Sequence, residues 1–360
     1  MKNDLKVIAI NLTSKCNLKC MHCARKDDEQ LQEELSISFF IDILKQATSL
    51  GTENVNITGG EIFLRKDCFE LIENALSLGY FVGIESNGTL IKKEHVEKMS
   101  TYGKNFRISI SLDGVTAEVH DAIRGKGSFS KTISALELLS QYNIPARVIT
   151  VLNKNNMDQI PELVRYVTKE LDLGFRLIPN IIEYGRGIYT HNEYGVNYLE
   201  VNKLLENFYF DFLREKNSEK FSVELSIALV PIDVDFHNNC QWGKAMIGIS
   251  PYGTVNLCHV QGSDERFIFG DLKKNSLKDI WENSIILNRF RDMNPNNLKG
   301  ICGNCLARDY CRGGCRLHAI SKYNDFLAPD PQCQIVYNMG MFPEYAIDDL
   351  NRSSDYKEGV

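Results

Sequence analysis

The first half of the chain alternates short β-rich runs with amphipathic helical stretches. The runs are rich in Val, Ile and Phe, which is typical of strands covered by helices on one side and by a core on the other. We expect strands at Val7–Leu12, Asn54–Thr58, Phe81–Ser86, Phe106–Ser111, Arg147–Val151 and Phe175–Pro179. Apolar residues at helical spacing predict helices between Ser36 and Gly51 and over Phe69–Leu78, Lys92–Tyr102, Phe129–Tyr142 and Ile160–Leu171.

Strand–helix repeats of this kind predict a parallel sheet with right-handed crossovers. Six units over residues 1–180 make an α/β fold, a partial (β/α)6 TIM-like barrel. The chemistry of such folds lies at the carboxyl ends of the strands. Polar or cysteine motifs follow the first four strands and should share one rim: Cys16–Cys23, Gly59-Gly60-Glu61, Asn87-Gly88 and Asp113-Gly114.

The second half of the chain lacks this repeat. Residues 181–239 form a connecting region with helical character at Leu199–Leu213. Residues 240–335 are rich in cysteine and glycine and show little helical periodicity, so we expect metal clusters to staple a region that cannot build a large core. Residues 336–360 end in a polar tail, which we expect to fray from Ile347 onward.

Composition narrows the class of protein. A net charge of −6 and a pI near 5.7 argue against nucleic acid or an anionic membrane as partner. No apolar run is long enough to span a bilayer, and the N-terminus does not resemble a signal peptide, so we expect a cytoplasmic protein. In that reducing compartment the eleven cysteines favour metal binding over disulfides.

The first cysteine group is Cys16-x3-Cys20-x2-Cys23, three thiolates within eight residues. Iron–sulfur clusters take thiolate ligands, normally four, so three would leave one iron open to a chelating substrate. The alternatives are a zinc site and incidental cysteines. Zinc needs a fourth ligand, and His22 beside Cys23 is poorly placed to supply it.

This spacing resembles the signature of the radical S-adenosylmethionine (SAM) superfamily, CxxxCxxC. The resemblance implies a [4Fe–4S] cluster whose free iron binds SAM, and a 5′-deoxyadenosyl radical formed by one-electron cleavage. Thr58-Gly59-Gly60-Glu61 resembles the family's segment that meets the SAM amino group. The resemblance also implies SAM contacts for His22 at the adenine, through its backbone, and for a set of polar residues: Asn87, Ser109, Ser111, Asp113 and Arg124.

These polar residues have a second interpretation. Surface or capping roles would also explain Asn87, Ser109, Ser111, Asp113 and Arg124. Arg124 would otherwise pair with the SAM carboxylate in bidentate fashion. Cys68, which opens a predicted helix, is interpreted as a small core residue.

The C-terminal cysteines resemble the SPASM domain, the auxiliary-cluster module of radical SAM maturases. The resemblance implies two auxiliary iron–sulfur clusters, the first held by Cys302, Cys305, Cys311 and Cys333 and the second by Cys240, Cys258 and Cys315. The second set is one ligand short, because Met246 stands where some relatives carry a cysteine. Three possibilities remain for this second cluster: an iron with an open position, a ligand other than cysteine, or a smaller cluster core. A zinc ribbon of Cys302, Cys305, Cys311 and Cys315 would leave the other three cysteines without a purpose.

Three function classes remain. The first is a maturase that oxidatively modifies a ribosomally made peptide, by a thioether or carbon–carbon crosslink or by decarboxylation. The second is an enzyme that modifies the propionates of a tetrapyrrole. A sulfatase-type maturase is disfavoured because His259 follows Cys258, where those enzymes carry an aspartate base; His259 is a candidate proton acceptor or a packing residue of the cluster. The third class, an electron carrier without radical chemistry, has no need of the Gly59-Gly60-Glu61 segment.

The resemblance also implies partners. A flavodoxin or ferredoxin would supply the electron. The chain starts only fifteen residues before Cys16, which leaves no room for an N-terminal leader-binding domain, so we expect a separate leader-recognition protein if the substrate is a peptide.

Overall fold

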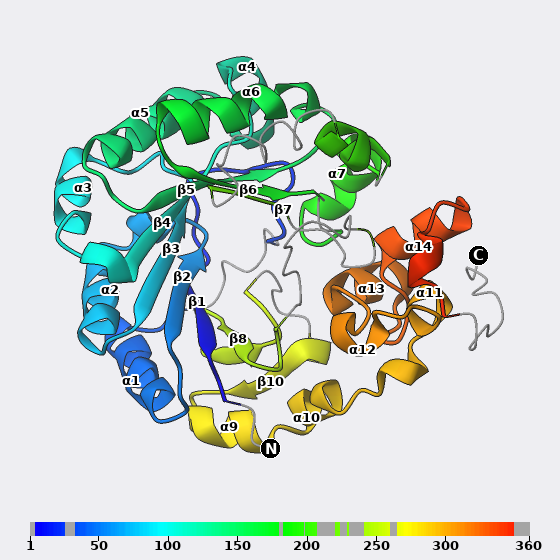
Figure 1. The fold of residues 1–360 in the computed structure, drawn as a ribbon. Helices are drawn as coiled ribbons and strands as arrows, with labels where there is room; N and C mark the ends of the chain where they lie inside the picture. Colours follow the sequence, from blue (N-terminus) through cyan, green and yellow to red (C-terminus); the bar gives the residue numbers. More distant parts are fainter. Residues whose placement is uncertain are drawn as a thin grey trace.

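The computed structural model describes residues 4–25, 33–179, 183–197, 199–206, 220–223, 229, 241–259 and 265–348. Its framework is a ten-stranded sheet in the order β10-β9-β8-β1-β2-β3-β4-β5-β6-β7. Figure 1 shows the strands curving around a central space with helices on the outer side. The fold class predicted from the sequence, a partial α/β barrel, is therefore confirmed.

All six predicted strands form, each within one residue of its expected ends, and neighbours pair in parallel. They match the pattern because alternate residues pack under the helices in the main hydrophobic core. The strands are β1 (Val7–Thr13), β2 (Asn54–Gly59), β3 (Phe81–Ser86), β4 (Phe106–Ser111), β5 (Ala146–Val151) and β6 (Gly174–Ile178).

The predicted helices also form, and one further helix appears. The predicted set comprises α1 (Ile37–Thr48), α2 (Cys68–Ser77), α3 (Lys93–Met99), α5 (Ser128–Gln141) and α6 (Ile160–Arg165), which continues as a π turn over Tyr166–Glu170. Cys68 is buried at the start of α2, as expected for a core residue. The sequence did not predict α4 (Ala117–Arg124), which begins where the Thr116 side chain accepts a hydrogen bond from the Val119 amide.

The C-terminal region extends the barrel sheet, which the sequence did not predict. Strand β8 (Met246–Ile249) pairs in parallel with β1, and β9 (Thr254–Asn256) and β10 (Ile268–Asp271) follow in antiparallel order. Ile247, Ile249 and Val255 belong to the same hydrophobic core as the barrel strands. At the opposite edge β7 (Phe221–Val223) pairs in parallel with β6. The sheet therefore has more strands than the six parallel strands that the sequence predicted.

Residues 240–335 also contain more helix than their pattern indicated. The helices have four to eight residues and span only about one or two turns, too few for a visible apolar period. They are α9 (Leu277–Asn283), α10 (Ile285–Arg291), α11 (Gly300–Gly303), α12 (Arg308–Cys311), α13 (Arg316–Tyr323) and α14 (Pro331–Asn338). A second small core, around Ile301, Val336 and Phe342, lies among these helices.

The connecting region is partly described. It contains α7 (Gly187–Tyr194) and a helical segment at residues 199–206. The rest of the helix expected over Leu199–Leu213 lies outside the described residues, as do Cys240 and the tail from residue 349. Across the described ranges, no helix combines the length and hydropathy needed to cross a membrane.

Because β8 shares the barrel core, Ile247→Ala should destabilise the whole chain and not only its C-terminal region. Removing this fully buried side chain is expected to cost about 2–5 kcal/mol of unfolding free energy. Urea denaturation followed by circular dichroism should show one shifted transition. Ile285→Ala, at a side chain that is 72% exposed, is the matched control and should change the midpoint little. Two transitions, with only one of them shifted, would contradict a common core.

Candidate functional site

A large cavity, which we call the rim cavity, lies at the carboxyl ends of the barrel strands. Its volume is about 250 Å³, and all three thiols of the first cysteine group line it. Of the other residues expected there, six also line it: His22, Gly59, Gly60, Asn87, Ser111 and Arg124. Glu61, Ser109 and Asp113 do not line the cavity, and the contacts of these three explain why.

Residues 14–23, which follow β1 and contain Cys16, Cys20 and Cys23, form a loop that we call the cysteine loop. Hydrogen bonds hold it from two sides. On one side Glu34 accepts hydrogen bonds from the Thr13 hydroxyl (2.8 Å) and from the amide and hydroxyl of Ser14 (2.7 and 2.9 Å). On the other side Arg186 donates from Nε to the Cys20 carbonyl at 2.9 Å and from its amide to the Cys23 carbonyl. The loop geometry therefore depends on segments far away in the sequence.

Gly59 and Gly60 allow the chain to pass directly against this loop. The Gly60 amide donates to the Thr13 carbonyl at 2.8 Å. Gly59 has φ of +142°, and a Cβ there would lie 2.5 Å from the Thr13 carbonyl oxygen. A Cβ at Gly60 would overlap the Lys15 carbonyl. Both glycines are thus required by a close approach of two backbone segments as well as by their place in the cavity wall.

Glu61 is fully buried and binds protein groups. Its carboxylate accepts from the Ser86 hydroxyl (2.8 Å), the Asn87 amide (2.8 Å) and the Phe63 amide (3.3 Å). Burial raises the pKa of Glu61 above its ordinary value, although these hydrogen bonds act in the opposite direction. The side chain joins the end of β2 to the end of β3.

Asp113 and Arg124 form a buried ion pair under the cavity. Arg124 donates from Nε to Asp113 at 2.6 Å, and its Nη1 lies 3.8 Å from the Cys20 sulfur. Asp113 also accepts from the Val151 amide at 3.0 Å. Burial alone would raise the pKa of Asp113, but Arg124, the neighbouring histidines and this amide outweigh it and hold the pKa below its usual range. The charged side of Arg124 is therefore already shared between a carboxylate and a thiol.

The remaining predicted polar residues lie at different depths. Asn87 donates from Nδ2 to Asn17 at 2.9 Å and lies 4.0 Å from the Cys16 sulfur. Ser111 lines the cavity, whereas Ser109 lies two residues deeper along β4 and accepts from Arg147 Nε at 2.9 Å. His22 is buried in the cavity wall, and burial lowers its pKa to about 4, so the ring is neutral near pH 7.

A second thiol-lined cavity lies among the C-terminal helices. Cys302, Cys305, Cys311 and Cys333 all line it, the same four cysteines that the resemblance to the SPASM domain assigns to one cluster. The Asp330 amide lies 3.2 Å from the Cys302 sulfur and donates to it. Amide–sulfur hydrogen bonds of this kind stabilise thiolates and tune cluster potentials.

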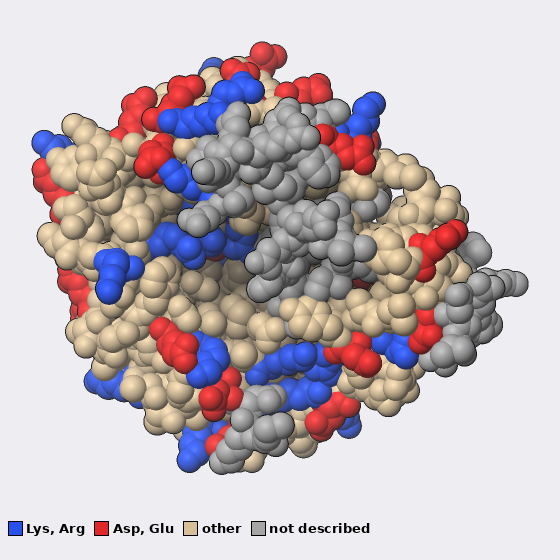
Figure 2. All heavy atoms as spheres, in the orientation of Figure 1, with Lys and Arg blue, Asp and Glu red and all other residues tan. Residues whose placement is uncertain are grey.

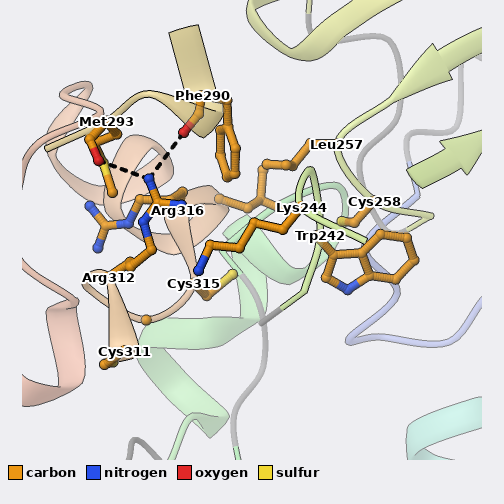
Figure 3. A pocket seen from close by; sticks show the side chains of 12 residues that line it. Trp242, Lys244, Leu257, Cys258, Phe290, Met293, Cys311, Arg312, Cys315 and Arg316 are labelled. Carbon is orange, nitrogen blue, oxygen red and sulfur yellow. Dashed lines mark hydrogen bonds between the residues drawn. The ribbon is translucent and has the colours of Figure 1, made fainter. Parts of the chain in front are cut away.

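A third cavity lies between β8–β9 and the helices, and Figure 3 shows its lining. Cys258 and Cys315 line it. The aromatic side chains of Trp242 and Phe290 and the basic side chains of Lys244, Arg312 and Arg316 also line it. Cys240, the third cysteine of this set, lies outside the described residues. Met246 is not among the lining residues, since it lies in β8 beside Val7. Cys311 lines both C-terminal cavities.

His259 follows Cys258 and reaches toward the barrel. Its ring lies 5.3 Å from the Trp242 ring, centroid to centroid, and its carbonyl accepts from Asn11 at 2.8 Å. Burial lowers the pKa of His259, Glu85 raises it and Arg176 lowers it further, so the net direction is downward. The ring is neutral near pH 7, the state in which an imidazole can accept a proton.

Several residues of the cavity wall were not predicted as site residues, among them Glu85, Arg186 and Arg25, whose Nη1 donates to the Thr13 carbonyl at 3.1 Å. Glu85, at the end of β3, accepts from the Thr58 hydroxyl at 3.0 Å; an acidic residue in an otherwise apolar strand was the available signal. Arg186 comes from the connecting region, where no sequence pattern indicated contact with the cysteine loop.

The donor chemistry fits iron–sulfur clusters. Within the described ranges, no three Cys, His, Asp or Glu side chains converge closely enough for a single metal ion, and the thiols instead surround cavities. Burial raises the pKa of the thiol of Cys20 to about 11 and that of Cys302 to about 12. Since metal ligands must be thiolates, cluster binding would release protons from these groups. The polar lining of the rim cavity also suits the amino and carboxylate groups of SAM.

Comparison with known proteins agrees with this geometry. The model of the radical SAM superfamily matches residues 10–167, and a model described as an iron–sulfur cluster-binding domain, SPASM, matches residues 240–306. Mycofactocin maturase MftC of Mycolicibacterium smegmatis is 30% identical over 89% of this chain and 81% of its own length. The AdoMet-dependent heme synthase of Methanosarcina barkeri is 28% identical over 94% of this chain and 99% of its own length.

Among solved structures, Streptococcus suis SuiB bound to its precursor peptide SuiA has a similar fold. The TM-score is 0.75 at 22% identity, and the match covers 93% of this chain and 76% of SuiB. At this level of identity the likeness concerns the fold alone.

Gly60→Ala should prevent assembly of the rim site. The added Cβ would overlap the Lys15 carbonyl, so the cysteine loop must move away from the end of β2. We expect the iron content and the visible absorbance of the purified, reconstituted variant to fall to the level of a protein lacking Cys16, Cys20 and Cys23. Gly103→Ala is the control: at φ of +68° and with open space around it, the change strains the backbone of an exposed turn without displacing a neighbour. Normal iron content in Gly60→Ala would show that the close approach is not needed.

Asp113→Asn should destabilise the apoprotein by about 3–5 kcal/mol, because Arg124 would keep its buried charge without a counter-charge. Asp42→Asn breaks an exposed pair with Lys45 and should cost less than about 1 kcal/mol. Urea denaturation measures both effects. A small effect of Asp113→Asn would mean that Arg124 finds another partner.

The same ion pair should depend on pH. The folded-state pKa of Asp113 is lowered, so its contribution is complete above the unfolded pKa of about 3.9 and is lost as pH falls through the lower folded value. The stability difference between the wild type and Asp113→Asn should therefore be constant above about pH 5 and narrow below about pH 4. Denaturation curves at several pH values test this.

Proposed function

The chain belongs to the radical SAM superfamily, and from this premise we propose that it oxidatively modifies a ribosomally made peptide. Membership makes it an enzyme that uses SAM with an iron–sulfur cluster and carries a SPASM region for auxiliary clusters. When bound, SAM and the cluster supply a 5′-deoxyadenosyl radical that abstracts hydrogen. Thioether or carbon–carbon crosslinking and oxidative decarboxylation are the proposed outcomes.

Three thiol-lined cavities carry this proposal, one at the barrel rim, one beside β8 and β9 and one among the C-terminal helices. Cys16, Cys20 and Cys23 would hold the SAM cluster, while Gly59, Gly60, Asn87, Ser111, Arg124 and the buried His22 would bind and orient SAM. Glu61, Asp113 and Ser109 would act one step away, by positioning strand ends and Arg147.

Oxidative modification of a peptide removes two electrons, and the radical takes only one with its hydrogen atom. The auxiliary clusters would accept the second electron. Cys302, Cys305, Cys311 and Cys333 would hold one of them, and Cys258 and Cys315 with Cys240 the other. Since β8 lies beside β1, the second of these sites adjoins the barrel. His259, neutral and close to both, would accept the proton released in this step.

The peptide substrate is supported by relatives. MftC is named a maturase, and SuiB, whose fold this chain shares, was solved with a precursor peptide. The proposal also includes a separate leader-recognition protein, a flavodoxin or ferredoxin as electron donor, and a cytoplasmic location.

A tetrapyrrole substrate is the second candidate. The heme synthase relative matches 99% of its own length and 94% of this chain, so the two chains correspond almost from end to end. The haem-propionate chemistry of such a protein would use the same cavity and the same auxiliary clusters.

Anaerobic co-expression with the small peptides encoded nearest the gene tests the proposal. The mass of one peptide should fall by two hydrogens, or by carbon dioxide, only with the intact enzyme. The control is the triple change of Cys16, Cys20 and Cys23 to alanine. Unchanged masses for every peptide, while the enzyme still converts SAM to 5′-deoxyadenosine, would overturn the peptide proposal in favour of the tetrapyrrole.

A further inference from the structure

Three arginines lie on neighbouring strands of the barrel, below the rim cavity. They are Arg107 on β4, Arg147 on β5 and Arg176 on β6. All three are half-buried. Figure 2 shows basic side chains in the hollow centre of this face of the molecule.

Strand alternation places these side chains on the inner face of the barrel. Ser111 lines the cavity, and Arg107 lies four residues before it on the same face of β4. Ile149 also lines the cavity, and Arg147 lies two residues before it on β5. Arg176 pairs in register with Ile149, and its charge acts on Glu85, which is also in the cavity wall.

The charges in this cluster are unequal. Glu85 is a buried acidic group that favours the charged forms of both Arg176 and Arg147, although burial lowers the pKa of both arginines overall. One carboxylate therefore faces more than one guanidinium. Arg147 donates to the neutral Ser109, and Arg107 lies over the Phe81 ring at 5.5 Å from its centroid. Among the residues that the structure describes, neither Arg107 nor Arg147 forms an ion pair with a carboxylate.

Burial lowers the pKa of each of these arginines. It lowers the pKa of Arg147 to about 9; the charges of Arg176 and Arg107 add to the effect, and Glu85 opposes it. The pKa of Arg107 is lowered by burial as well. Charged groups removed from water are normally paired. Glu85 supplies one negative charge against three arginines, and an anionic ligand between these side chains would balance more of the remaining positive charge.

We propose that Arg107 and Arg147 bind a carboxylate group of the substrate inside the barrel. The guanidinium fork matches a carboxylate in two parallel hydrogen bonds. This inference rests on the proposed function, because it assigns the substrate class of that same cavity. The carboxylate would belong to an acidic side chain or C-terminus of a peptide, or to a propionate of a tetrapyrrole.

The position of the pair also orients the substrate. Two residues along a strand span about 6.6 Å, so Arg147 lies about one such step below the level of the cavity wall and Arg107 about two. A substrate whose carboxylate is held there would present a carbon several bonds away to the rim cavity. Substrates that differ in this spacing would be discriminated.

Matched pairs of probes test the proposal on the reconstituted enzyme. Coproporphyrin, with four propionates, is compared with its tetramethyl ester by fluorescence titration. An N-acetylated, C-amidated hexapeptide with two glutamates is compared with its glutamine counterpart by calorimetry. We expect one carboxylate probe to bind about ten- to a hundredfold more tightly than its neutral partner. The pair that shows this difference identifies the source of the carboxylate.

Substitutions then assign the site. Arg147→Gln and Arg107→Gln should each remove most of the preference for the carboxylate probe, and Arg147→Lys should keep part of it. Arg165→Gln, at an exposed arginine of α6, removes the same charge elsewhere and should have no effect. Equal binding of charged and neutral probes, absence of binding by both carboxylate probes, or a preference unchanged in both glutamine variants would overturn the proposal.

This result is separate from that of the co-expression experiment. A modified peptide without carboxylate-dependent binding would refute the arginine site and leave the maturase proposal standing. Carboxylate-dependent binding of coproporphyrin with no modified peptide would support the site and refute the peptide substrate.

Discussion

Two buried carboxylates hold the rim of the barrel together, and the candidate site depends on them. Glu61 receives hydrogen bonds from the end of β3, and Asp113 joins the end of β4 to β5 and to Arg124. Parallel strands have no tight turns between them, so such side-chain contacts add to the sheet ladder in fixing the strand ends. Without these carboxylates the cysteine loop, the glycine segment and Arg124 would lack a common frame. The residues nearest the chemistry are thus positioned by residues that do not reach the cavity.

Much of the fold could be predicted because its signals are local. The six barrel strands show as short apolar runs, and cysteine spacing alone separated the rim group from the C-terminal groups. The placement of β8 beside β1 could not be predicted, since strand pairing across more than 200 residues leaves no mark on either segment. The C-terminal helices were missed because they are too short to show a period.

The candidate site shows the same division. Residue types and motifs identified His22, Gly59, Gly60, Asn87, Ser111 and Arg124, all of which line the cavity. Glu61, Asp113 and Ser109 bind other protein groups, because tertiary neighbours decide the direction of a side chain at or near a strand end. The basic cluster of Arg107, Arg147 and Arg176 could not be predicted from the sequence, since each arginine is the single basic residue of its own strand.

The hydrogen bonds from Arg186 to the cysteine loop can form only well after the loop itself has been synthesised. The Cys20 carbonyl and the Arg186 side chain are separated by 166 residues. A chain emerging at about 5–20 residues per second exposes the three cysteines many seconds before that partner exists. The loop that carries the three cysteines therefore gains these hydrogen bonds only after the start of α7 has been synthesised.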